Sequence, residues 1–339
     1  MKVRFFNPSL WYLQHKKEID SEISRVLSAG DLILRSDVEK FEENLANFVG
    51  TKYAVALNSG TDALVLALKS AGVTGGAVVG VPSHTFKATC GAVITADGMP
   101  YVYDVGGIAE NIYSINIPVH IAGELSPMPR HGIVIEDAAQ ALGAVKNPSS
   151  FAQCWSFYPA KILGAYGDAG GLTTNNKEVY EYVREARNHF KNDNSGFGIN
   201  SRMDNLQAAI LNVKFKYLPS FLARREEIAQ KYKALEGVEL PNYQEGRVWQ
   251  DYIIRLPARY DMSEDKYEPD NYRRDKLYEF LKENGIETMK NEYPWTPEFS
   301  KPPLAAKYEA ETLRIPCNPD LTSEEVDFVI EKINAFGLL

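Results

Sequence analysis

Short apolar runs, each followed by a helical or looping segment, constrain the fold of this chain more than any other feature. After the first run, a tight turn leads into a helix whose apolar residues repeat at helical spacing from Leu64 to Ala71. Short apolar strands separated in this way are typical of a mostly parallel sheet covered by helices on both faces. We therefore predict an α/β fold. The runs are residues 53–57, 78–81, 101–105, 117–119 and 133–135.

The segments on either side of these runs predict mainly helices. Residues 1–45 are expected to form helix and loop, and the pattern from Gln207 to about Leu235 is helical, with Pro219 predicted to bend or break it. We place a domain boundary near residue 215, between a large domain (1–215) and a smaller α+β domain (216–339). In the smaller domain we expect a strand at 249–256, a surface loop at 259–274, and helices at 275–284 and 323–335.

The overall charge argues against nucleic acid as a partner. The chain has 37 basic and 45 acidic residues, so its formal net charge is −8 at pH 7 and its field repels phosphate backbones. A local cluster of cations is able to bind phosphate although the net charge of the chain is negative. A small nucleotide-linked molecule is therefore not excluded.

Cysteine usage and the N-terminal residues predict a soluble, cytoplasmic protein. Cys90, Cys154 and Cys317 are far apart and match no zinc or CxxC spacing, which indicates reduced thiols and no metal site. The N-terminal segment lacks the long apolar core and small-residue cleavage site of a signal peptide. No apolar run approaches the roughly 20 residues of a membrane helix, so we expect no membrane span.

The first candidate site is the turn Asn58-Ser59-Gly60-Thr61, between the first predicted strand and a helix. The free N–H groups and the dipole of a helix N-terminus attract an anion such as phosphate. The alternative is an ordinary helix cap, with Ser59 or Thr61 as the N-cap residue. The motif alone leaves both interpretations open.

The second candidate site follows the predicted strand at 133–135, where the sequence continues Glu136-Asp137-Ala-Ala-Gln140. An acid in this place lies at the carboxyl edge of a parallel sheet, where open α/β folds bind ligands. Asp137 is able to hold a pyridine nitrogen protonated, because an adjacent anion raises the pKa of a base. Gln140, one turn on, is placed to donate to a ring oxygen. The alternative is that Asp137 caps a following helix.

The third candidate is Lys161, which lies among aromatic residues and glycines in the segment 154–171. Partial burial lowers the pKa of a lysine and makes it a better nucleophile toward an aldehyde. Ser156, five residues earlier, is placed to reach the same anion as Gly60 and Thr61. A lone lysine in a glycine-rich loop is usually structural, but this segment is more specific than that.

The fourth candidate is the segment 198–209, a loop that enters a helix. Ser201 or Asp204 is expected to cap this helix. A loop with a cap accounts for the whole segment except the pair Asn200 and Arg202.

Six blocks of the sequence resemble, in order and in rough spacing, the nucleotide-sugar aminotransferases known as the DegT family. The resemblance covers nearly the whole chain and is strongest from residue 58 to 209. The family has the fold type I of pyridoxal-phosphate (PLP) enzymes, in which a mostly parallel, seven-stranded sheet is followed by a smaller α+β domain. The blocks are SGTDAL, PSHTFKAT, VIEDAAQALGA, SFYPAK, GDAGG and GINSRMDNLQAA.

The resemblance implies that the chain binds PLP and carries it through its pyridoxamine-phosphate form. Lys161 matches the lysine that forms a Schiff base with the cofactor and moves the proton, and Asp137 matches the partner of the pyridine nitrogen. The remaining matches are Gln140 near the ring hydroxyl, Phe86 stacked on the ring, Gly60, Thr61 and Ser156 at the phosphate, and Asn200, which reaches the phosphate from a neighbouring subunit. The last match implies a homodimer with shared active sites.

By this resemblance the chain transfers an amino group, usually from L-glutamate, to a keto group of a nucleotide-linked sugar. The resulting amino sugars commonly enter polysaccharides or glycosylated metabolites. One alternative is a PLP-dependent sugar dehydratase, although such relatives have histidine in place of Lys161. Another is a cofactor-binding regulatory protein without turnover.

The chain departs from the family pattern in three segments. Residues 104–136 and 147–153 look shorter than the pattern, and residues 290–303 lack a histidine-containing motif that some relatives carry. The cofactor positions lie outside these departures. We therefore expect the substrate-facing loops, rather than the cofactor site, to differ from those of relatives.

Overall fold

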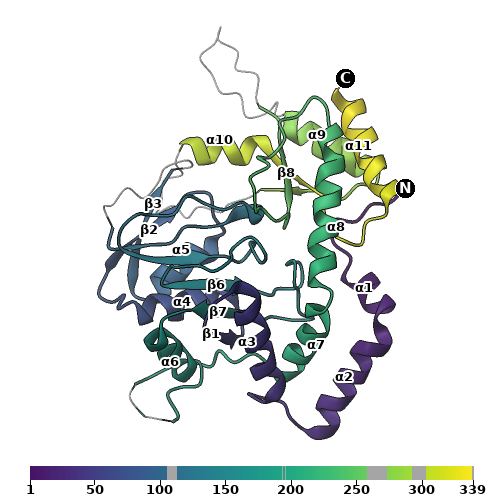
Figure 1. The fold of residues 1–339 in the computed structure, drawn as a ribbon. Coiled ribbons are helices and arrows are strands. Elements are labelled where there is room, and N and C mark those ends of the chain that lie inside the picture. Colours follow the sequence, from purple (N-terminus) through teal and green to yellow (C-terminus); the bar gives the residue numbers. More distant parts are fainter. Residues whose placement is uncertain (105–112, 193, 195, 258–272, 292–302, 338–339) are drawn as a thin grey trace.

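A seven-stranded sheet is the centre of the structure, which is a computed structural model (Figure 1). The structure describes residues 1–104, 113–192, 194, 196–257, 273–291 and 303–337. In sheet order, the strands are β1 (Tyr53–Leu57), β7 (Gly170–Thr174), β6 (Ala152–Ser156), β5 (Ile133–Asp137), β4 (Ile115–Asn116), β2 (Ala77–Pro82) and β3 (Gly98–Tyr103).

The direction of the strands brings several strand ends to one edge of the sheet. β3, β2, β4, β5 and β6 run parallel, whereas β7 is antiparallel to both of its neighbours, β6 and β1. β1 therefore points the same way as β5 and β6. The residues that follow Leu57, Asp137 and Ser156 meet at this carboxyl edge. The predicted mostly parallel sheet is confirmed.

Strands β6 and β7 are not among the predicted strands, because polar residues and glycines interrupt their apolar pattern. Gln153 of β6 and Thr173 of β7 are fully buried, and Thr173 Oγ1 donates to Gln153 Oε1 at 2.9 Å. The hydrogen bond satisfies both side chains inside the sheet, which makes their burial tolerable.

The predicted strand at 117–119 is wrong in its bounds. β4 ends at Asn116, two residues before Pro118, which has no N–H to donate to a neighbouring strand. The backbone N–H of Ile117 still donates to Gly80 O at 2.8 Å. Beyond Pro118, Val119 forms only an isolated bridge with Asp137.

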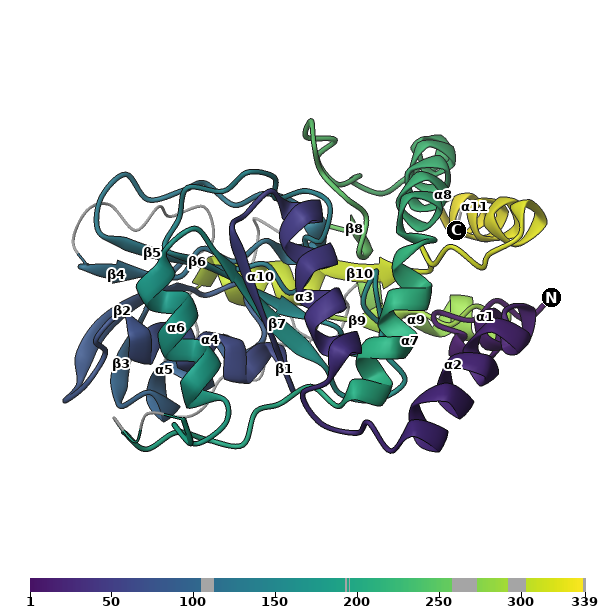
Figure 2. The ribbon, with the colours of Figure 1, turned by 60° about the horizontal axis from the view of Figure 1, so that its bottom comes forward.

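Helices cover both faces of the sheet (Figure 2). A strand that is covered on both faces directs successive side chains to opposite sides of the sheet. In β1, Val55 and Leu57 pack in one core, and Ala54 and Ala56 pack in the other. One face is covered by α4 (Gly60–Ser70), α5 (Lys87–Thr95) and α6 (Lys177–Ala186), and the other by α3 (Ser36–Val49) and α7 (Asn205–Phe215).

A second, three-stranded sheet has its own core. It is antiparallel, in the order β8 (Tyr252–Arg255), β10 (Thr312–Ile315) and β9 (Met289–Lys290). Its core includes the buried rings of Tyr232 and Tyr252. Around it lie α8 (Leu218–Lys231), α9 (Arg273–Glu283), α10 (Pro303–Glu311) and α11 (Ser323–Gly337).

The helical segment around Pro219 breaks as predicted. α7 ends at Phe215 and α8 begins at Leu218, so Pro219 occupies the first turn of α8, where its missing N–H costs no hydrogen bond. Residues 258–272, most of the predicted loop at 259–274, lie outside the described residues. Arg273 and Arg274 belong to α9, and buried Arg274 donates to Glu309 O at 2.8 Å.

The N-terminal segment contacts both parts of the molecule. α1 (Pro8–Gln14) and α2 (Lys16–Ala29) place the buried side chains Trp11 and Ile19 against α7 and α8. Before them, Val3 packs in the core of the second sheet and exchanges backbone hydrogen bonds with Gly285 and Glu287. The division of the chain at residue 215 stays a prediction. In the described ranges, no helix combines the length and the apolar character that crossing a membrane requires.

Candidate active site

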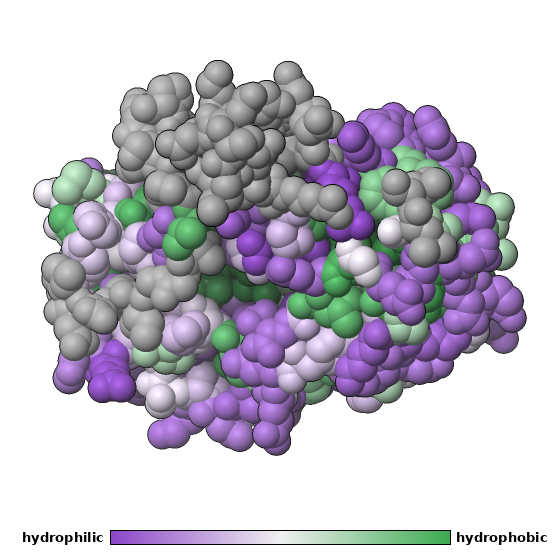
Figure 3. Space-filling model, turned by 90° about the horizontal axis from the view of Figure 1, so that it is seen from above, coloured by the Kyte–Doolittle hydropathy of each residue, from purple (hydrophilic) through white to green (hydrophobic). Residues whose placement is uncertain are grey.

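A cavity of about 560 Å³ lies between the carboxyl edge of the large sheet and the second sheet. Seen from above, the surface is hollowed near its middle, and apolar residues show inside the hollow (Figure 3). A volume of this size suits a cofactor or another small molecule. The predicted site residues that line the cavity are Gly60, Thr61, Phe86, Asp137, Gln140, Ser156 and Lys161.

The turn before α4 combines a helix cap with a close backbone approach. Ser59 is the N-cap residue, and its Oγ accepts a hydrogen bond from the N–H of Asp62 at 3.1 Å, so the cap interpretation is right for Ser59. A Cβ on Gly60 would lie 3.0 Å from Ser156 Cβ. The start of the helix is thus pressed against the end of β6. The remaining free N–H groups of its first turn suit an anion.

Asp137 is buried at the end of β5 and is held by neutral donors. Thr89 Oγ1 donates to its Oδ2 at 2.8 Å, and the N–H of Ala139 donates to its Oδ1 at 3.2 Å. Turns rather than a helix follow residue 137, so the alternative that Asp137 caps a helix is wrong. A buried carboxylate that lines a cavity is suited to binding a cationic group of a ligand.

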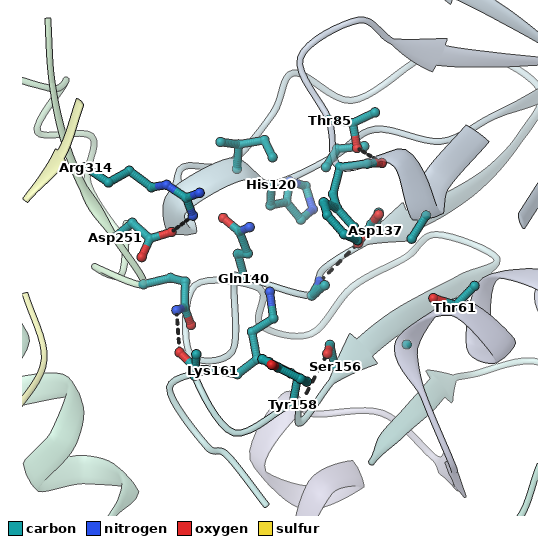
Figure 4. A pocket seen from close by; sticks show the side chains of 18 of the residues that line it. Thr61, Thr85, His120, Asp137, Gln140, Ser156, Tyr158, Lys161, Asp251 and Arg314 are labelled. Carbon is teal, nitrogen blue, oxygen red and sulfur yellow. Dashed lines mark hydrogen bonds and ion pairs between the residues drawn. The ribbon is translucent and has the colours of Figure 1, made fainter. Parts of the chain in front are cut away.

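Lys161 lies on the cavity wall in a tight loop after β6 (Figure 4). Burial lowers the pKa of Lys161, and the carboxylates of Asp251 and Asp137 offset part of this effect. A Cβ on Gly164 would lie 2.1 Å from Pro159 O, so the loop requires glycine at this close approach. The lowered pKa favours an uncharged amine, which is the nucleophilic form.

Gln140 and Phe86, which are expected near the hydroxyl and on the face of a cofactor ring, both line the cavity. Gln140 Oε1 accepts a hydrogen bond from the N–H of Ala122 at 2.6 Å, in a short turn where Ala122 has a φ of 53°. The carbonyl end of Gln140 is thereby fixed, and its amide nitrogen is the end that can donate to a ligand. Phe86 precedes α5 and is 55% exposed, with its ring on the cavity.

Gln250 holds the backbone on both sides of Lys161, and the sequence gives no signal for this role. Its Nε2 donates to Ala160 O at 2.9 Å, and its Oε1 accepts from the N–H of Ile162 at 2.8 Å. Gln250 lies just before β8 of the second sheet, 89 positions beyond Lys161 in the chain. The second sheet therefore helps to orient Lys161.

His120 is a second residue of the cavity wall that sequence reasoning misses. The N–H of Ser126 donates to His120 Nδ1 at 3.0 Å, so the ring proton lies on Nε2 and is donated to Glu136 Oε2 at 2.9 Å. Both side chains are buried. This arrangement fixes one tautomer of the ring and holds Glu136, the neighbour of Asp137.

Asn200 is the one predicted cofactor residue that does not line the cavity of its own chain. It is exposed and forms a backbone bridge with Asn188. The adjacent Ser201 is buried and donates from its Oγ to Asn58 Oδ1 at 3.0 Å, which ties this loop to the turn before α4. Asp204 is the N-cap residue of α7 but makes no side-chain cap hydrogen bond.

Comparison with known families gives one match that spans most of the chain. The family is described as the DegT/DnrJ/EryC1/StrS aminotransferase family, and its model matches residues 13–334. The chain is 34% identical, over an alignment 383 residues long, to the pleiotropic regulatory protein of Geobacillus stearothermophilus, with 99% of each chain covered. It is 31% identical, over 382 residues, to the dTDP-3-amino-3,4,6-trideoxy-alpha-D-glucose transaminase of Streptomyces venezuelae, with 99% of this chain and 96% of the relative covered.

Two solved structures have the same fold over nearly the whole chain. The crystal structure of S. venezuelae DesV in complex with a ketimine intermediate matches with a TM-score of 0.87 at 29% identity, and covers 99% of this chain and 98% of DesV. The structure of NtdA from Bacillus subtilis with bound cofactor PMP matches with a TM-score of 0.84 at 27% identity, and covers 100% of this chain and 86% of NtdA.

Proposed function

This chain belongs to the DegT/DnrJ/EryC1/StrS aminotransferase family, and from this premise we propose that it binds PLP at Lys161 and aminates a keto sugar carried by a nucleotide. The observation that carries the proposal is the place of Lys161, which shares one cavity with Asp137 and with the turn before α4. The amino donor that we propose is L-glutamate. The transaminase of S. venezuelae, whose name specifies a dTDP-linked sugar, supports the choice of substrate class.

The residues of the cavity fit PLP by their chemistry. The backbone at Gly60 and Thr61, together with the Ser156 hydroxyl, would hold the phosphate, and the Phe86 ring would cover the pyridine ring. Asp137 would hold the ring nitrogen in its protonated form. When bound, PLP withdraws electrons from the carbon that loses its proton.

Lys161 performs two tasks in this proposal, and both use its Nζ. As an uncharged amine, a form that burial favours because it lowers the pKa of Lys161, Nζ would hold the cofactor in the cavity. With an amino donor in the cavity, the same Nζ would be free to take a proton from the donor's carbon. It would return a proton to the carbon of the keto sugar that receives the amino group.

The experiment that tests the proposal locates the cofactor and measures its turnover. Purified protein with PLP should show a visible absorption band that borohydride abolishes, and peptide mapping should find the reduced adduct on Lys161. The Lys161→Ala variant should still bind the cofactor phosphate but should release 2-oxoglutarate from L-glutamate at least about a hundredfold more slowly. Lys87→Ala, at an exposed lysine beside Phe86, is the matched control and should keep the rate. An adduct on another lysine would contradict the assignment.

A regulatory protein that binds the cofactor without turnover is the second candidate. The observation that favours it is the similarity to the pleiotropic regulatory protein of G. stearothermophilus. Release of 2-oxoglutarate by the purified wild-type protein separates the two candidates, because a protein without turnover would release none. A sugar dehydratase is disfavoured by Lys161, since the dehydratases that resemble this chain carry histidine there.

We further propose that two chains form a dimer with shared sites. Within one chain, exposed Asn200 does not line the cavity. Its predicted role at the cofactor phosphate therefore requires the neighbouring subunit. Isologous dimers use the same surface twice, so each chain would lend its Asn200 and receive one.

A further inference from the structure

Arg314 and Asp251 form a charged wall of the cavity that none of the predicted cofactor roles uses. Both come from the second sheet: Arg314 lies on β10, and Asp251 directly precedes β8. In Figure 4 they lie on the opposite side of Lys161 from Thr61, and the guanidinium of Arg314 points into the cavity. Because the turn before α4 accounts for the cofactor phosphate, a cation on the opposite wall is available to a reactant.

The guanidinium of Arg314 is only partly neutralised. Its Nη1 lies 3.3 Å from Asp251 Oδ2, longer than the usual 2.7–2.9 Å of a charge-assisted hydrogen bond. Within the described residues its buried Nε has no hydrogen-bond partner. The side chain is 24% exposed, so it can still reach a molecule in the cavity.

Arg225 also lines the cavity, and its buried Nε likewise has no hydrogen-bond partner within the described residues, but its Nη1 is fully used. Its Nη1 donates to three backbone carbonyls, those of Trp249, Gln250 and Cys317, at 2.8–2.9 Å. This arginine joins the segments before β8 and after β10 and is committed to the fold. Among the cations that line the cavity, Lys161 is assigned to the cofactor. Arg314 is therefore the cation left for a reactant.

We propose that Arg314 binds a carboxylate of a reactant, and that Asp251 is the counter-ion that this carboxylate competes with. The inference rests on the proposed function, because it concerns a molecule that reacts beside Lys161. A guanidinium suits a carboxylate, since its fork of N–H groups matches the two oxygens. The carboxylate comes either from the amino donor or from an acidic sugar.

The two partners should act in opposite directions if Arg314 binds an anion. Arg314→Gln removes the cation and weakens carboxylate binding. Asp251→Asn removes a like charge beside the bound carboxylate and strengthens it. If the pair only held the cavity in shape, both variants would weaken the same contact and would change binding in the same direction.

Calorimetric titration of the PLP-loaded protein with unreactive acids tests this without requiring turnover. The probes are succinate, which stands for the amino donor, and glucuronate, which stands for an acidic sugar. Losing a charged hydrogen bond of about 1.5–3 kcal/mol weakens binding roughly tenfold or more, and this is the loss expected for Arg314→Gln. Arg314→Lys should lose less, and Asp251→Asn should bind the same probe more tightly. Circular dichroism verifies that each variant is folded.

The outcomes identify the source of the carboxylate. If Arg314→Gln weakens the binding of succinate alone, the carboxylate belongs to the amino donor. If it weakens the binding of glucuronate alone, the carboxylate belongs to the sugar. The proposal is overturned if wild-type protein binds neither probe, if Arg314→Gln changes both affinities by less than about twofold, or if both variants weaken binding alike. Release of 2-oxoglutarate is measured separately. If the protein releases no 2-oxoglutarate but its binding of succinate depends on Arg314, the carboxylate site is supported and the proposed activity is not.

Discussion

In the proposed function, Asp137 and Gln250 would serve the same reaction from different parts of the cavity wall. Asp137 is the last residue of β5, and its carboxylate lines the cavity. Gln250 uses both ends of its amide on the backbone of the loop that carries Lys161. In the proposed function one residue would therefore act through its charge, and the other through the position of Lys161. The two roles make different predictions for substitution.

Replacing Asp137 with asparagine should nearly abolish amino transfer. An adjacent carboxylate raises the pKa of a base by about 1–3 units, so at a pH above that pKa its removal lowers the protonated fraction of the ring nitrogen by up to about tenfold for each unit. We expect Asp137→Asn to lose about tenfold or more in amino-transfer rate while it keeps most of its cofactor, and Asp137→Glu to be partly tolerated. Asp327→Asn, on the surface of α11, is the control. Wild-type activity in Asp137→Asn would refute the role of this residue.

Gln250→Leu should lower kcat more than it changes KM. The substitution leaves Ala160 O and the N–H of Ile162 without their partner, which costs about 1–3 kcal/mol for each buried group. Lys161 then loses its fixed position, although the turn before α4 is untouched. Steady-state kinetics on protein that still binds PLP provides the measurement, with exposed Gln230→Leu as the control. An unchanged kcat would mean that Gln250 only stabilises the fold.

At the scale of elements, the site depends on how closely the turn before α4 approaches strands β6 and β7. A Cβ on Gly170 would lie 2.1 Å from the carbonyl carbon of Ser59, and one on Gly60 would lie 3.0 Å from Ser156 Cβ. Backbone atoms cannot yield as a flexible side chain does. The glycines of this segment are therefore required by close packing at the sheet edge.

Two glycine-to-alanine substitutions should change stability in opposite directions. Gly170→Ala forces the turn away from the sheet and should lower the free energy of unfolding by about 1–3 kcal/mol. Gly91 lies inside α5 with open space around its Cβ position, so Gly91→Ala should raise it by about 0.5–1 kcal/mol. Urea unfolding of both proteins measures the difference. If Gly170→Ala were as stable as wild type, the close approach to Ser59 would be wrong.

At the scale of the whole molecule, the cavity is a joint product of two sheets. The large sheet supplies Asp137, Ser156 and the turn before α4, and the second sheet supplies Asp251 and Arg314. The N-terminal segment joins the halves, since Val3 packs with the second core while Ile19 packs against α7. A change in how the halves meet would alter the cavity without changing any of its residues.

Mixing two inactive variants tests whether the site also needs a second chain. In a heterodimer of Lys161→Ala and Asn200→Ala subunits, the proposed sharing places both lesions in one site and leaves the other intact. Subunit exchange should therefore restore up to one active site per heterodimer, measured as 2-oxoglutarate released from L-glutamate. The homodimer of each variant, taken through the same exchange, is the control. Heterodimers that form without regaining activity would show that Asn200 acts within its own chain.

Local pattern was enough to predict the fold class and one wall of the cavity. In an open parallel sheet, the residue after a strand lies at the carboxyl edge wherever the strand packs. The positions of Gly60 and Asp137 on the cavity could therefore be anticipated, and so could the break between α7 and α8 at Pro219. Each of these features depends on neighbours a few residues away in the chain.

Only the tertiary structure shows the opposite wall and the hidden strands. Gln250, Asp251 and Arg314 line the same cavity as Lys161 although many residues of chain separate them from it, and no spacing rule links residues that are so far apart. β6 and β7 have polar side chains that are tolerated because they bond to each other inside the sheet. The sequence determines which elements form, through short-range periodicity and backbone preference. The packing of the two sheets decides which side chains share a cavity, because that depends on contacts that exist only in the folded chain.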